Sequence, residues 1–195
     1  MKREKILTRL HQAAEERKIV AVWLRGRGWD EGVWPLQVSE NMALCAHDGN
    51  FLLDGWDVFA IDAIERVRFR YDKYGEFAAE EGLLEQITGP GVPVDGWQAF
   101  FAALPADQLI GVERRHAPDG ESRFAVGRVV KAGKKRVHMI CVDSEAVWEE
   151  EPWRIRYGDI EAVRIGDRYL TGFGRHAGEP GIQEERADAQ SDGQT

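Results

Sequence analysis

The chain has 195 residues, of which 43% are hydrophobic and 31% are charged, and its formal net charge is −8. These proportions are ordinary for a globular protein, and no apolar run approaches the roughly 18 residues that span a bilayer, so no membrane span is expected. The acidic balance argues against tight, non-specific binding of nucleic acid, which depends on neutralising phosphates.

The first half of the chain predicts a helix followed by short strands. Residues 2–17 carry apolar side chains at helical spacing, and their charged start differs from a secretory signal, so we expect a cytoplasmic protein. Strands are expected where β-branched and aromatic residues lie between turn signals, at 18–25, 31–38, 42–47, 51–53, 56–61 and 64–70. A further stretch, 74–87, has helical spacing that Gly82 interrupts.

The second half predicts the same order of elements. Residues 89–96 are rich in proline and glycine and predict a linker. A short apolar helix at 97–104 follows, and strands are expected at 109–114, 123–132, 136–142, 147–148, 153–157 and 160–165. From residue 178 to 195 the chain is polar and charged, which predicts a disordered tail.

An internal duplication explains this repeated order. Residues 42–69 and 138–165 align without a gap at an offset of 96, with five identities in 28 pairs, four of them in one run, I-E-x-V-R. The sequence therefore predicts one repeat over 1–88, a linker over 89–96 and a second repeat over 97–177. The alignment also places Cys45 on Cys141, which predicts a buried cysteine in each copy rather than a disulfide. Because no cysteines or histidines have zinc spacing, we expect neither a metal site nor a cofactor.

A helix followed by five short, bent strands resembles the Sm-like barrel and, more loosely, the SH3-like barrels. The residues that carry the resemblance are the strand 124–129 with Gly127 inside it, the Asp119-Gly120 turn before it, and the closing residues 164–166; Gly32 suggests the same bend in the first copy. The resemblance implies a mainly β protein with short helices, built as two tandem five-stranded Sm-like or SH3-like barrels, each preceded by a helix. Sm-like proteins hold an RNA base with an Asp-x-φ-Asn loop, and residues 132–135 lack that motif.

Basic residues concentrate in the early strands of the second repeat, where they form a candidate phosphate-binding face. The alternative is a solvated sheet face balanced by nearby acids. The eight residues are Arg114, Arg115, Arg123, Arg128, Lys131, Lys134, Lys135 and Arg136. Trp148 and Trp153 flank an acidic run and suit either base stacking or packing in a core or interface.

The repeated strand I-E-x-V-R contains a second pair of candidate interface residues, Arg68 and Arg164. Both faces of this strand mix charged and apolar side chains, as in an edge strand. It either pairs with a neighbouring barrel, as Sm-like strands do in rings, or forms a local salt bridge.

No catalytic set is evident, because neither His47 nor His138 has a nucleophile near it in the pattern. The sequence therefore favours a non-catalytic adaptor that acts on an unidentified protein partner, with self-assembly left open. The alternative is an RNA-binding protein that uses the basic strands of the second repeat.

Overall fold

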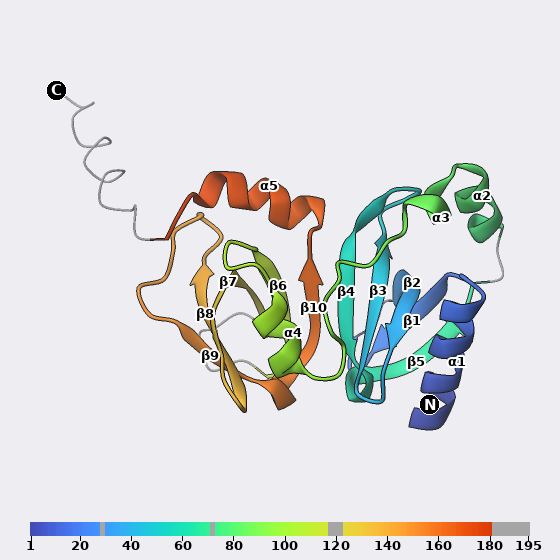
Figure 1. Cartoon of the computed structure of the whole chain (residues 1–195), viewed down its shortest axis with the longest axis horizontal. Helices are drawn as coiled ribbons and strands as arrows, with labels where there is room; N and C mark the ends of the chain where they lie inside the picture. Colours follow the sequence, from blue (N-terminus) through green and yellow to red (C-terminus); the bar gives the residue numbers. More distant parts are fainter. Residues whose placement is uncertain (28–29, 71–72, 117–122, 181–195) are drawn as a thin grey trace.

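A computed structural model describes residues 1–27, 30–70, 73–116 and 123–180 (Figure 1). The strands are β1 Val20–Leu24, β2 Asp30–Val38, β3 Met42–Asp48, β4 Leu53–Ala60, β5 Ile64–Phe69, β6 Ile110–Arg114, β7 Phe124–Ala132, β8 Arg136–Val142, β9 Trp153–Arg156 and β10 Ile160–Ile165. The helices are α1 Arg3–Glu15, α2 Tyr74–Glu80, α3 Leu83–Gln86, α4 Trp97–Ala103 and α5 Arg168–Ala177, with 3-10 turns at Ile61–Ala63 and Tyr157–Asp159. The Asp119-Gly120 turn and the predicted tail beyond residue 180 lie outside the described residues.

All ten strands form one antiparallel sheet, in the order β5-β1-β2-β3-β4-β10-β6-β7-β8-β9. Each half of the chain contributes five strands in the same order, with its fifth strand beside its first. The halves meet where β4 pairs with β10, side by side at the centre of Figure 1. The described part of the chain has no helix long and apolar enough to cross a membrane.

The prediction of a mainly β protein with short helices is confirmed, but the prediction of two closed five-stranded barrels is wrong. Closure would require β4 to pair with β5 and β9 to pair with β10. Instead β4 pairs with β10, and the sheet stays open at β5 and β9. The backbone groups on the outer side of β4 need hydrogen-bond partners, and the neighbouring half supplies them.

The strand register refines the sequence alignment between the halves. In β5 and β10 the alignment holds, since Phe69 faces Val20 of β1 and Ile165 faces Ile110 of β6. In β3 and β8 the alignment is shifted by two residues. The pair Val38–Ala43, next to the turn between β2 and β3, corresponds to the pair Ala132–Val137, next to the turn between β7 and β8. Cys45 and Cys141 are both free and buried, but they do not occupy equivalent positions. A shift of two residues keeps each side chain on the same face, so hydrophobic pattern alone does not reveal it.

Glycines allow close backbone approach at two places in the sheet. A Cβ on Gly127 would collide with the backbone of β8 at Ile140, so this glycine has the tight packing that the sequence predicts. Gly55 has a φ of +77°, and a Cβ there would lie 2.5 Å from the backbone nitrogen of Asp167. Gly55 therefore lets β4 approach the end of β10 where the halves join. Gly32 has no such backbone contact.

Each half has a main hydrophobic core, and both cores extend across the joint, because Ala162 belongs to the first core and Val58 to the second. Helix α1 buries Ile6 and Leu10 against the first half, as their helical spacing predicts. Helix α4 buries Phe100 and Phe101 against the second half. Trp97 packs against both cores, so the start of α4 helps to hold the halves together.

Helix α5 was not predicted, because Gly172 and Gly174 lower the helical propensity of its sequence. Its start is fixed by Asp167, whose carboxylate accepts a hydrogen bond from the main-chain N–H of Leu170 at 2.6 Å. The main-chain N–H of Arg168 donates to Asp54 of β4 at 2.8 Å. The aspartate before the helix was the available sequence signal.

Candidate functional site

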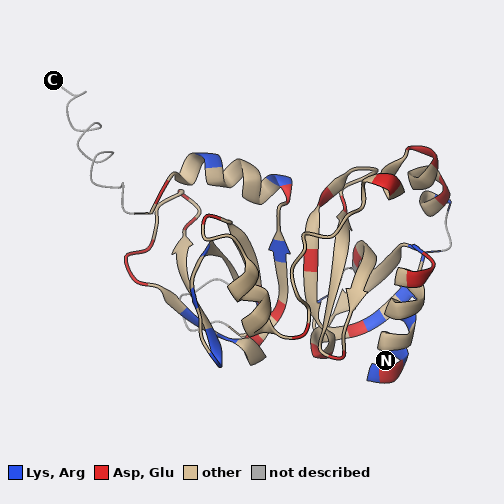
Figure 2. Cartoon of the chain, in the orientation of Figure 1, with Lys and Arg blue, Asp and Glu red and all other residues tan. Residues whose placement is uncertain are grey.

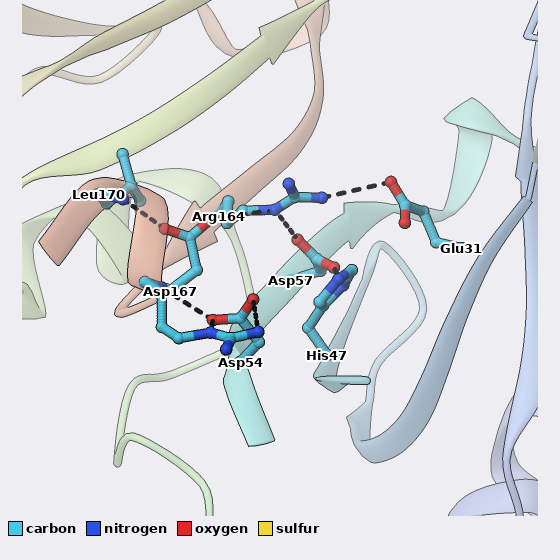
Figure 3. Close-up of polar contacts among 8 residues, drawn as sticks. Glu31, His47, Asp54, Asp57, Arg164, Asp167 and Leu170 are labelled. Atoms are coloured by element: carbon cyan, nitrogen blue, oxygen red, sulfur yellow. Dashed lines mark hydrogen bonds and ion pairs between the residues drawn. The ribbon is translucent and has the colours of Figure 1, made fainter. Parts of the chain in front are cut away.

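A group of charged side chains crosses the joint between the two halves (Figure 3). We call Glu31, His47, Asp57, Arg164 and Asp167 the joint cluster. Arg164 faces Asp57 in the strand register, and its Nε donates to the Asp57 carboxylate at 3.0 Å. Its Nη2 donates to Glu31 at 3.2 Å, and His47 Nδ1 lies 2.7 Å from the other oxygen of Asp57. Since the Asp57 side chain is only 3% exposed, these contacts replace water around a buried charge.

The surroundings in the joint cluster favour the ionised forms of Asp57 and His47. Burial alone would raise the pKa of Asp57, but the hydrogen bond from His47 and the charge of Arg164 outweigh burial and lower this pKa. Burial alone would lower the pKa of His47, but its contact with Asp57 outweighs burial and raises it. Glu31 and Asp167 differ, because burial raises the pKa of both carboxyl groups. The contact that joins the two halves is thus the ion pair of Arg164 with Asp57.

A second charged group lies on the same strand. The Glu161 side chain in β10 is 2% exposed, and nitrogens of three arginines lie within 4 Å of its carboxylate. Arg27 of the first half lies 3.6 Å away, Arg115 3.7 Å and Arg123 3.4 Å. Arg27 also pairs with Glu113 at 2.7 Å. Arg115 and Arg123, two of the eight residues of the candidate phosphate-binding face, therefore form ion pairs with a buried carboxylate.

Two more residues of that face are also engaged. Arg114 is 4% exposed, with its guanidinium 4.8 Å from the centre of the Trp153 ring. Arg128 pairs with Glu179 and lies 5.2 Å from the centre of the Trp148 ring. Trp148 itself is buried, and its indole N–H donates to the carbonyl of Ala177 at 2.9 Å. It therefore packs in the interior of the second half rather than at its surface.

The remaining basic residues gather at one place, the turn between β7 and β8 and the adjoining strand β9. Figure 2 shows blue segments along this lower end of the second half. We call this surface the basic edge; its residues are Lys131, Lys134, Lys135, Arg136, Arg154 and Arg156. All six are exposed. Among these six, only Arg156 forms an ion pair within the described residues, with Asp159 at 2.7 Å.

Sequence reasoning missed Arg154 and Arg156 as members of this surface. The available signal was the alternation in β9, where buried Ile155 separates two exposed arginines. This period of two is typical of a strand with one buried face.

Strand β9 is an open edge of the sheet. It pairs with β8 on one side, and no strand of the described chain pairs with its other side. Tyr157 N–H donates to the carbonyl of Lys135 at the end of this pairing. Because antiparallel bonding alternates, the N–H and C=O groups of Arg154 and Arg156 point away from β8.

The opposite edge, β5, is occupied. Its outward carbonyls at Glu65 and Val67 accept hydrogen bonds from the main-chain nitrogen of Met1 and from the side chain of Arg9. Arg68 is exposed on this strand and lies 5.9 Å from the centre of the Trp23 ring. Its counterpart in the repeat, Arg164, is the centre of the joint cluster. The two candidate interface arginines thus have different surroundings.

The surroundings of the Cys45 thiol disfavour covalent chemistry at this residue. Cys45 lies across from Asp57 in the sheet, and burial together with the nearby carboxylate raises the pKa of its thiol well above the usual value. A raised pKa disfavours the reactive thiolate. Across the described ranges, no group of three or more histidine, cysteine, aspartate or glutamate side chains could hold a metal ion.

No family model, curated protein or solved structure matches this chain.

Proposed function

We propose that this protein is a non-catalytic adaptor that binds an acidic, extended segment of a partner protein along β9. The observation that supports this is the open edge of β9 beside six exposed cations, of which Arg156 alone has an ion pair within the described residues. An added strand would satisfy the outward backbone groups of Arg154 and Arg156, and acidic side chains would neutralise the basic edge.

One feature of the basic edge favours an added peptide over RNA. The aromatic residue beside the basic edge is already engaged, because the Tyr157 hydroxyl donates to the carbonyl of Gly133 at 2.7 Å and its ring stacks on Phe101. Bases that stack on a protein need an exposed aromatic face.

Two features favour a different protein over a second copy of this chain. Pairing of β9 with β9 would bring Arg154 and Arg156 of one copy close to the same residues of the other, and like charges across strands are destabilising. Pairing of β9 with β5 would require the bonds of Arg9 and Met1 to β5 to break.

The test is a titration of the full chain with a labelled peptide of alternating glutamate and valine, followed by fluorescence anisotropy. A peptide of alternating lysine and valine keeps the strand pattern and reverses the charge. We expect binding of the acidic peptide only, and about tenfold weaker binding by the double variant R154E/R156E, because each repulsive charge pair costs up to about 1 kcal/mol.

A proline variant separates strand addition from simple charge attraction. Arg154→Pro removes an N–H that points away from β8, so pairing of β9 with β8 is expected to survive while an added strand is blocked. Loss of peptide binding in this variant, with the circular dichroism spectrum retained, supports strand addition. Undiminished binding would contradict it. If the variant does not fold, protection of the Arg154 and Arg156 amides from hydrogen exchange by the bound peptide carries the test.

A polyuridine 15-mer in the same assay tests the RNA alternative. Polyuridine binding that weakens with salt and is lost in R154E/R156E, with no binding of the acidic peptide, would overturn the adaptor proposal in favour of RNA.

A further inference from the structure

An aromatic cavity lies in the second half, away from the turn between β7 and β8. Its volume is about 470 Å³, within the range of ligand sites in proteins. It is bounded by the start of β7, the end of β8, the start of β9 and helix α5. Four aromatic residues line it: Phe124, Trp153, Tyr169 and Phe173.

The aromatic walls have a defined arrangement. Tyr169 and Phe173 lie one helical turn apart on α5, with ring centres 5.6 Å apart and ring planes 17° apart. Phe124 of β7 lies 6.4 Å from Tyr169, at 47°. A Cβ on Gly111 would lie 2.5 Å from the Phe124 ring. The ring can pack over β6 because Gly111 has no side chain. The Tyr169 side chain is 55% exposed, which leaves an apolar face open to a ligand.

The charges on the cavity lining have one sign. Of the described residues that line it, Asp143 and Glu149 are acidic and none is basic. One oxygen of Asp143 accepts from the main-chain N–H groups of Glu145 and Val147, which fixes the loop. The main-chain N–H of Glu149 donates to the carbonyl of Cys141 at 2.8 Å, which fixes the backbone here. Glu149 is exposed, and its carboxylate has no ion pair with any described residue.

We infer that this cavity binds an organic cation with an apolar body, such as a quaternary ammonium or an alkylguanidinium group. Aromatic faces attract cations through their quadrupole, and the carboxylate of Glu149 adds an opposite charge at the same cavity. Trp153 supplies apolar surface rather than a cation-binding face, because the guanidinium of Arg114 already lies over its ring. Binding of a cation here does not use the outward backbone groups of Arg154 and Arg156, on which strand addition at β9 depends.

Choline and its uncharged isostere 3,3-dimethyl-1-butanol provide a matched pair of probes. Both are titrated into the full chain and followed by tryptophan fluorescence and calorimetry. We expect choline to bind about tenfold tighter than the isostere, as a cation–π site with a carboxylate predicts. N-acetylarginine amide is the second cationic probe, and tighter binding of this compound than of choline identifies a peptide side chain as the natural source of the cation.

Three exposed positions test which residues form the site. Tyr169→Ala and Glu149→Gln are each expected to weaken choline binding about tenfold. Glu151→Gln, in the same acidic run but not part of the cavity lining, is expected to leave it unchanged. Equal binding of choline and its isostere would overturn the inference. So would binding of neither cationic probe, or equal effects of the two glutamate variants.

Discussion

Removing the arginine at the centre of the joint cluster is expected to destabilise the whole chain. Arg164→Ala deletes the Nε that lies 3.0 Å from Asp57 and the Nη2 that lies 3.2 Å from Glu31. Breaking a fully buried ion pair costs about 3–5 kcal/mol. Since the Arg164 side chain is 30% exposed and Asp57 keeps its contact with His47, we expect a loss of about 2 kcal/mol.

The duplication provides the control for this variant. Arg68 occupies the equivalent position in the first half, but it is exposed on β5, so Arg68→Ala is expected to cost less than about 0.5 kcal/mol. Urea unfolding followed by tryptophan fluorescence gives both free energies. Equal losses for the two variants would refute the assignment of the joint cluster as a stabilising contact between the halves.

Two further predictions concern the same joint. Gly55→Ala is expected to lower the free energy of unfolding by about 2 kcal/mol or more, because φ is positive and a Cβ would collide with the end of β10. Gly172→Ala in helix α5 is the control: a Cβ there meets open space, and we expect the free energy of unfolding to rise by about 0.5–1 kcal/mol. Urea unfolding measures both. His47→Gln is expected to cost more stability at pH 5.5 than at pH 8.5. The pKa of His47 is raised in the folded state, so its contribution is complete below the ordinary value of 6.5 and is lost as pH rises through the raised value. His138→Gln is the control for loss of an imidazole, and a pH-independent cost for His47→Gln would contradict the reasoning.

The sequence predicts most elements because their signals are local. The alternation of apolar residues and the turn signals locate the strands, and the helical spacing of Ile6 and Leu10 locates α1. Which strand edges meet is not a local property. Pairing of β4 with β10 depends on the approach that Gly55 permits and on the contact of Arg164 with Asp57, and the two halves supply these residues from positions far apart in the chain.

The candidate site was predictable in part for the same reason. The concentration of basic residues marks the second half as the candidate binding region. Lys134 and Lys135 lie on the exposed turn that Gly133 predicts. The sequence does not show that Arg115 and Arg123 contact Glu161, since a buried carboxylate inside a strand has no signature of its own. Only the arrangement of the strands separates the engaged arginines from the basic edge.

The most direct test of the proposed binding edge is amide hydrogen exchange measured by NMR, with and without the acidic peptide. In the free protein the amides of Arg154 and Arg156 are expected to exchange fast, because they point away from β8, while Ile155 is protected. Saturating peptide is predicted to protect Arg154 and Arg156 specifically. Peptide binding that leaves these two amides exchanging at the free rate would contradict strand addition at β9.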